Sequence, residues 1–79
     1  MATYGTLATD GLGERIREVR FSLGLNQRAF ARRLGVSYAA VSIWEQDRQT
    51  PKIDHLSKIA EAGGVTLEWL RKGGSMQWI

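Results

Sequence analysis

The sequence contains no cysteine, one proline and one histidine among its 79 residues. Small secreted domains usually depend on disulfides, so a chain without cysteine favours a reducing compartment such as the cytoplasm. A zinc site is disfavoured as well, because its ligands are mainly cysteine and histidine side chains. The lone His55 directly follows Asp54. Adjacent residues of a helix point in different directions, so we expect no catalytic dyad there.

Long apolar runs are also missing. No segment approaches the roughly 20 apolar residues that cross a bilayer, and the first residues lack the basic and apolar regions of a signal peptide. Paired carboxylates and glycine-rich phosphate loops are absent too. We therefore expect no membrane association, no metal and no cofactor, and the sequence gives almost no support to an enzyme.

The composition that remains is that of one small globular domain. Hydrophobic residues make up 43% and charged residues 24%, with a net charge of +3. The basic balance weakly favours a polyanionic partner. A core this small stabilises a fold only marginally, so association with a second copy or a partner would help.

Helical periodicity begins at Gly11. Residues 1–10 are small and show no clear period, which predicts a flexible arm. The apolar residues of the first helix follow a spacing of four, three and four, which places them on one face. They are Leu12, Ile16, Val19 and Leu23. We expect Asp10 to cap this helix and Gly24 to end it.

Four more short helices are predicted from capping and stop residues. The expected N-caps are Asn26, Ser37 and Thr66, and the expected stops are Gly35, Gly63–Gly64 and Gly73–Gly74. Pro51 suits the first turn of the fourth helix. The prediction is an all-α, compact five-helix bundle over residues 11–74, followed by an apolar tail at 75–79.

The second and third predicted helices are joined by a turn that begins with glycine, which is the helix-turn-helix pattern. Ala31 is small where the two helices would cross, and Val41 and Trp44 would pack the third helix on the core. The residues left for the outer face are Ser37, Tyr38, Ala39, Ser42 and Ile43. Such a face can enter a groove closely, because small apolar groups touch thymine methyls and hydroxyls bond base edges.

The chain resembles a lambda-repressor-like helix-turn-helix DNA-binding domain, of the Cro/repressor type in the XRE family, in the segment GLNQRAFARRLGVSYAAVSIWEQDRQTP. The resemblance extends over residues 11–73 and ends with a fifth helix in GVTLEWLRKG. It implies a sequence-specific double-stranded DNA-binding transcriptional regulator, a phage or bacterial repressor that acts as a homodimer on a two-fold operator.

The resemblance also implies roles for single residues. The five outer-face residues match base-contacting positions. The positions for phosphate contact are Gln27, Arg28, Gln46, Arg48 and the backbone amides of Lys52 and Ile53. Arg20 and Glu45 match a structural ion pair between the first and third helices. Family members often carry glutamine or asparagine at base-facing positions, so the resemblance does not give the operator sequence.

Several alternatives stay open at this point. Ile43 fits the core as well as the groove, Tyr38 could be a surface residue without a partner, and Arg28 could belong to a solvated face. Arg32 and Arg33 are expected on that solvated face. Trp44, like Trp69, is expected in the core.

The apolar residues near the C-terminus exceed what a free end needs, which predicts a dimer interface. Its expected members are Trp69, Met76, Trp78 and Ile79, so Trp69 is assigned to both the core and the interface. The same tail supports an alternative function: an antitoxin or anti-repressor type of module that uses this fold to hold a protein partner.

Overall fold

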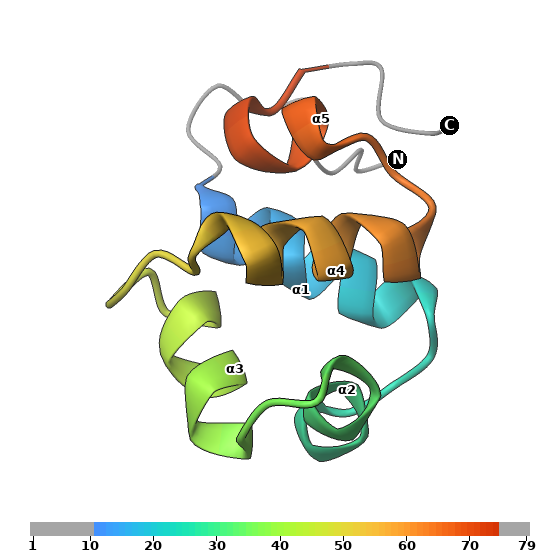
Figure 1. The fold of residues 1–79 in the computed structure, drawn as a ribbon, viewed down its shortest axis with the longest axis vertical. Helices are drawn as coiled ribbons and strands as arrows, with labels where there is room; N and C mark the ends of the chain where they lie inside the picture. Colours follow the sequence, from blue (N-terminus) through green and yellow to red (C-terminus); the bar gives the residue numbers. More distant parts are fainter. Residues whose placement is uncertain (1–10, 75–79) are drawn as a thin grey trace.

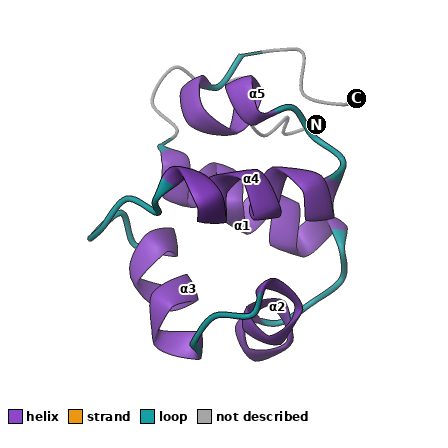
Figure 2. Cartoon of the chain, in the orientation of Figure 1, coloured by secondary structure: helices purple, strands orange, loops and turns teal. Residues whose placement is uncertain are grey.

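The computed structural model describes residues 11–74, which form five helices joined by short loops (Figures 1 and 2). Their bounds are α1 Leu12–Ser22, α2 Gln27–Leu34, α3 Tyr38–Glu45, α4 Ile53–Gly63 and α5 Leu67–Lys72. The all-α fold with a helix-turn-helix at α2 and α3 is confirmed. The predicted arm at 1–10 and the predicted tail at 75–79 lie outside the described residues.

The helices form a small bundle around one apolar core. In Figure 1, α1 and α4 lie across the middle, with α5 on one side and the pair α2 and α3 on the other. All five helices contribute buried side chains, and the largest of those that are fully buried are Trp69, Phe30, Ile16, Ile59 and Leu70. Full burial of a large apolar side chain is worth about 1.5–3 kcal/mol, so this core is the main source of stability.

Three of the predicted caps are present. Asn26 accepts a hydrogen bond from the Ala29 amide at 2.8 Å, and Ser37 accepts one from the Ala40 amide at 3.0 Å. Thr66 caps α5 in the same way. Each cap satisfies one of the amide donors that a helix leaves free at its start, so the starts of α2, α3 and α5 follow directly from sequence.

The expected cap of the first helix is wrong. Gly11 is the N-cap residue of α1, in place of Asp10, and it provides no side-chain hydrogen bond. The Gly13 amide, in the first turn of α1, instead donates a hydrogen bond at 2.8 Å to the carboxylate of Asp47, which is far away in the sequence. A carboxylate contributed by the loop after α3 therefore replaces the local cap.

The position of Pro51 also differs from the prediction. The first helical residue of α4 is Ile53 and its N-cap is Lys52, so the proline precedes the first turn. Pro51 is buried, and it lines a hollow together with Trp44 and His55. Its rigid ring thus packs the loop between α3 and α4 onto the core.

Trp69 belongs to the core alone, and its assignment to the dimer interface is wrong. The side chain is 1% exposed, because α5 packs against both α1 and α4. Arg15, itself buried, donates to the Leu70 carbonyl at 2.8 Å and to the Arg71 carbonyl at 2.9 Å. The end of α5 is thereby held against α1.

Within residues 11–74, none of the helices is long and apolar enough to cross a membrane.

Candidate nucleic-acid interface

The third helix has two chemically different faces. Its inner face buries Val41, Trp44 and Glu45. Its outer face exposes Tyr38 and Ala39, with Ser42 and Ile43 half-buried. Residues spaced by four share one side of a helix, so Tyr38 and Ser42 form one row that continues to Gln46, and Ala39 and Ile43 form the row beside it.

Glu45 links three helices through one buried carboxylate. Its side chain is 2% exposed, and it accepts from Arg20 Nε at 2.7 Å and from Arg20 Nη2 at 3.0 Å. The predicted ion pair between α1 and α3 is therefore present, in a two-pronged geometry. Gln27 Nε2, at the start of α2, donates to the same carboxylate at 2.9 Å. The beginning of α2 and the end of α3 thus share one anchor on α1.

Backbone contacts hold the same end of α3 against α1. Arg17 donates to the Glu45 carbonyl at 3.0 Å. A Cβ at Gly13 would lie 2.6 Å from that carbonyl oxygen, so only glycine permits this approach. Asp47, which satisfies the Gly13 amide, adopts a positive φ of 58°, a conformation that favours glycine, asparagine and aspartate. These contacts fix the orientation of α3 relative to the bundle.

Two helix starts meet at the N-terminal end of α3. Tyr38 is 44% exposed, and the Arg28 guanidinium carbon lies 4.5 Å from the centre of its ring. A shallow groove here is lined by Arg20, Asn26, Gln27, Arg28 and Tyr38. Arg28 and Tyr38 are therefore in contact, although the sequence assigned them to different roles.

A second contact orders the outer row of α3. Gln46 Nε2 donates to the Ser42 hydroxyl oxygen at 2.9 Å. Since the oxygen is engaged as an acceptor, the Ser42 hydrogen remains available to donate outward. The structure thus brings Gln46 beside a predicted base-facing residue.

The start of α4 offers backbone donors beside basic side chains. Lys52, the N-cap residue of α4, provides no side-chain hydrogen bond to the first amides of the helix. Free amides at a helix start, together with the helix dipole, attract anions. Arg48 and Lys52 are exposed, and Ile53 is 53% exposed, so this site is open. Asp54 in the first turn of α4 contributes a competing negative charge.

His55 has a packing role in the structure. Its ring centroid lies 5.1 Å from the Trp44 ring, at an interplanar angle of 42°. This contact joins the end of α3 to the first turn of α4.

Among residues 11–74, no group of three or more histidine, cysteine, aspartate or glutamate side chains could hold a metal ion.

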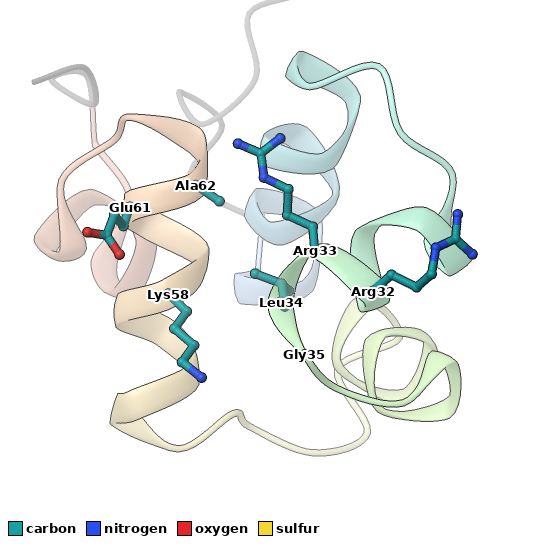
Figure 3. Close-up of a pocket in the computed structure, with 7 residues that line it drawn as sticks. All are labelled: Arg32, Arg33, Leu34, Gly35, Lys58, Glu61 and Ala62. Carbon is teal, nitrogen blue, oxygen red and sulfur yellow. The ribbon is translucent and has the colours of Figure 1, made fainter.

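A larger hollow lies between the end of α2 and the side of α4 (Figure 3). It is lined by Arg32, Arg33, Leu34, Gly35, Lys58, Glu61 and Ala62. In Figure 3 the side chains of Arg32 and Arg33 point away from that of Lys58, so these cations do not converge on one point. The exposed arginines fit the predicted solvated face.

The chain shows similarity to known DNA-binding proteins. Residues 16–70 match the helix-turn-helix family model. The chain is 36% identical over 63 residues to the HTH-type transcriptional regulator PuuR of Escherichia coli (strain K12), which covers 77% of this chain and 34% of PuuR. It is 35% identical over 69 residues to Repressor protein C2 of Salmonella phage P22, which covers 87% of this chain and 32% of that protein. The chain thus spans about a third of the length of these curated relatives.

Solved structures of the P22 repressor have a similar fold. The crystal structure of the P22 c2 repressor with a synthetic operator gives a TM-score of 0.78 at 35% identity, covering 84% of this chain and 100% of that chain. The solution structure of the DNA-binding domain of the same repressor gives 0.75 at 34% identity, covering 85% and 88%.

Sequence reasoning missed the residues that position the site. Arg17 and Asp47 hold the end of α3, and neither was singled out. Gly13 gave the one available signal, because a glycine near the start of a helix marks a close backbone approach. The contact of Arg28 with Tyr38 depends on the angle between two helices, which the sequence does not provide.

Proposed function

The chain belongs to the helix-turn-helix family, and from this we propose that it is a sequence-specific double-stranded DNA-binding transcriptional regulator, a repressor that acts as a dimer. The observation that carries the proposal is the asymmetry of α3: its inner face is anchored through Glu45, and its outer face is open and weakly charged. A helix held in this way can enter the major groove without changing its place in the bundle.

Base reading is assigned to the outer rows of α3. The Ser42 hydroxyl donates to an acceptor on a base edge, since Gln46 engages its oxygen. Ala39 and Ile43 are apolar and suit contact with thymine methyls. Ser37 and Tyr38 lie at the start of the helix, where recognition helices contact base edges.

Phosphate contacts are assigned to the positions that flank α3. Gln27 lies at the start of α2, and its carboxamide is held by Glu45. On the other flank, Arg48, Lys52 and the first amides of α4 bind a second phosphate through charge and backbone donors. Gln46 contributes to this flank from the end of α3. Such contacts set the register of α3 without reading sequence.

Repression then follows from occupancy alone. A dimer places two copies of α3 in half-sites about 34–36 Å apart, which is one turn of DNA. A dimer so placed blocks a promoter without any chemical step. Met76, Trp78 and Ile79, the proposed dimer contacts, lie outside the described residues. The partner is chromosomal or phage DNA, so we place the protein in the cytoplasm.

The names of the relatives support this assignment. One is called a transcriptional regulator and another a repressor, and the P22 c2 repressor was crystallised with a synthetic operator. Because the chain spans about a third of those relatives, the proposal concerns the DNA-binding function of this domain.

The test is selection of bound sites from random duplex DNA by the purified chain. We expect a two-fold palindrome whose half-site centres are about one helical turn apart. A matched variant, Ser42→Ala, removes an outer hydroxyl while leaving the buried face intact, and it should recover a weaker or altered consensus. Failure of the unaltered, folded chain to enrich any site would overturn the proposal in favour of the protein-interaction module.

A further inference from the structure

We propose that Arg28 and Tyr38 form one reading element, in which the tyrosine ring holds the arginine guanidinium against a guanine in each half-site. This inference rests on the proposed DNA-binding function and refines it. It moves Arg28 from the phosphate contacts to the base contacts, and it gives Tyr38 a positioning role.

The geometry comes from the packing of α2 against α3. Arg28 lies in the first turn of α2, and Tyr38 is the first residue of α3. The guanidinium carbon lies 4.5 Å from the ring centre, and both side chains are exposed. The arginine therefore turns toward the start of α3, where a recognition helix approaches the bases.

The second arginine of this groove has no comparable freedom. Arg20 donates from Nε and Nη2 to Glu45 and from Nη1 to the Leu25 carbonyl. The Arg28 side chain makes no hydrogen bond or ion pair to another residue within 11–74, and its contact there is with the Tyr38 ring. Arg28 thus holds a full set of guanidinium donors next to the outer face of α3.

The contact with the Tyr38 ring restricts the Arg28 side chain before DNA binds, so that less conformational freedom is lost on binding. A long arginine side chain loses rotamer freedom when it binds, and a stacked ring restricts it beforehand. A cation over an aromatic face gains about 0.5–1 kcal/mol when exposed and about 2 kcal/mol or more when desolvated, as it would be in the groove. The guanidinium donors remain available, because the contact with the ring engages the group as a cation and takes up none of its N–H donors.

Guanine is the base that fits this edge. Its major-groove side presents two acceptors, O6 and N7, which match the paired donors of arginine. A phosphate would also accept them, but a phosphate contact needs no tyrosine and carries no sequence information. Dependence on Tyr38 and on a single base therefore distinguishes the two roles.

The experiment uses the palindromic duplex recovered by the selection described above. Each guanine of the half-site is replaced in turn by 7-deazaguanine, which removes the N7 acceptor and retains base pairing. We expect one guanine at which the unaltered protein loses affinity about 5- to 150-fold. Arg28→Met keeps the aliphatic stem without the guanidinium, and should bind the normal and substituted duplexes equally.

Two tyrosine variants test the coupling. Tyr38→Phe keeps the ring and should retain sensitivity at the same guanine. Tyr38→Ala removes the ring and should lose most of it. Arg32→Met is the matched control, because Arg32 is exposed one turn along α2 and carries the same charge. It should leave the sensitivity unchanged. All the altered side chains are exposed, and thermal melting verifies that each variant folds.

Three results would overturn the inference while the proposed function stands. One is an operator with no guanine whose sensitivity requires Arg28. Another is full sensitivity in Tyr38→Ala, which would make the ring dispensable. The third is an equal loss by Arg28→Met on operator and random duplexes with a weaker salt dependence, which identifies a phosphate contact. Failure to recover any operator would instead count against the proposed function itself.

Discussion

The two faces of α3 differ in how they are held. On the inner face, Glu45 accepts hydrogen bonds from Arg20 and Gln27, and its carbonyl accepts from Arg17. On the outer face, the contacts are the Gln46–Ser42 hydrogen bond and the Arg28–Tyr38 ring contact. The partners of the inner face are half-buried around a buried Glu45, whereas Arg28, Tyr38 and Gln46 on the outer face are exposed.

This difference separates stability from recognition. Substitutions on the inner face should change the free energy of unfolding, because they leave buried polar groups without partners. Substitutions on the outer face should change affinity for DNA and leave unfolding almost unaltered, since surface changes are usually within about ±0.5 kcal/mol.

The largest effect is expected at the Glu45 anchor. Arg20→Met should lower stability by about 3–5 kcal/mol, because it leaves a buried carboxylate with less charge compensation. Glu45→Leu should do the same by leaving Arg20 uncompensated. Chemical denaturation measures both changes.

The double variant is the control for this pair. Arg20→Met combined with Glu45→Leu removes both charges, so it should cost much less than the sum of the single changes. Single changes as mild as ordinary surface substitutions would show that the anchor does not stabilise the fold.

On the outer face, Tyr38→Ala and Ser42→Ala should each cost about 1–3 kcal/mol on the operator and little on random duplex DNA. The reason is that base contacts, made by Ser42 directly and by Arg28 when Tyr38 positions it, contribute only when the matching base is present. Titration of both duplexes provides the comparison, and equal losses on both would assign the residue to the backbone.

Arg48 should behave in the opposite way. Arg48→Ala should weaken binding to operator and random DNA alike, and reduce the slope of log K against log salt by about 0.9. Titrations at two or more salt concentrations measure this slope. An unchanged slope would mean that Arg48 neutralises no phosphate.

Gln27 is expected to contribute both to the stability of the fold and to DNA binding. Gln27→Ala removes a neutral phosphate contact and also one hydrogen bond to Glu45. We expect a stability loss of about 1 kcal/mol, weaker binding to both duplexes and an unchanged salt slope. Unaltered stability would mean that the hydrogen bond to Glu45 contributes nothing to the fold.

The smallest effect is expected from the C-terminal tail. A chain that ends at Gly74 should dimerise more weakly, because it lacks the apolar residues proposed for the interface, above all Trp78. Sedimentation of both chains over a concentration series measures association. Equal association would remove residues 75–79 from the interface.

Local chemistry explains what the sequence predicted well. The caps Asn26, Ser37 and Thr66 act on amides three residues away, so helix starts could be read without knowing the fold. The glycine stops at Gly35 and Gly64 adopt positive φ for the same local reason. The family resemblance, confirmed by the match over residues 16–70, supplied the Arg20–Glu45 pair.

The wrong predictions concern contacts between residues that are far apart in the sequence. Asp47 caps α1 across space in place of Asp10, and Trp69 is buried because three helices meet around it. Neither fact follows from spacing along the chain. The outer-face roles of Tyr38 and Ser42 are proposals, because they consist of contacts with the operator DNA.

The central claim is that α3 is anchored to the bundle by its inner face and contacts DNA with its outer face. Its most direct test is the change in backbone amide NMR shifts of the labelled chain when the selected operator is added. We predict large changes at the start of α2, along α3 and in the first turn of α4. Amides of α5 and of the first turn of α1 should change little. Changes centred on α1 and α5 instead, with α3 unaffected, would contradict the account.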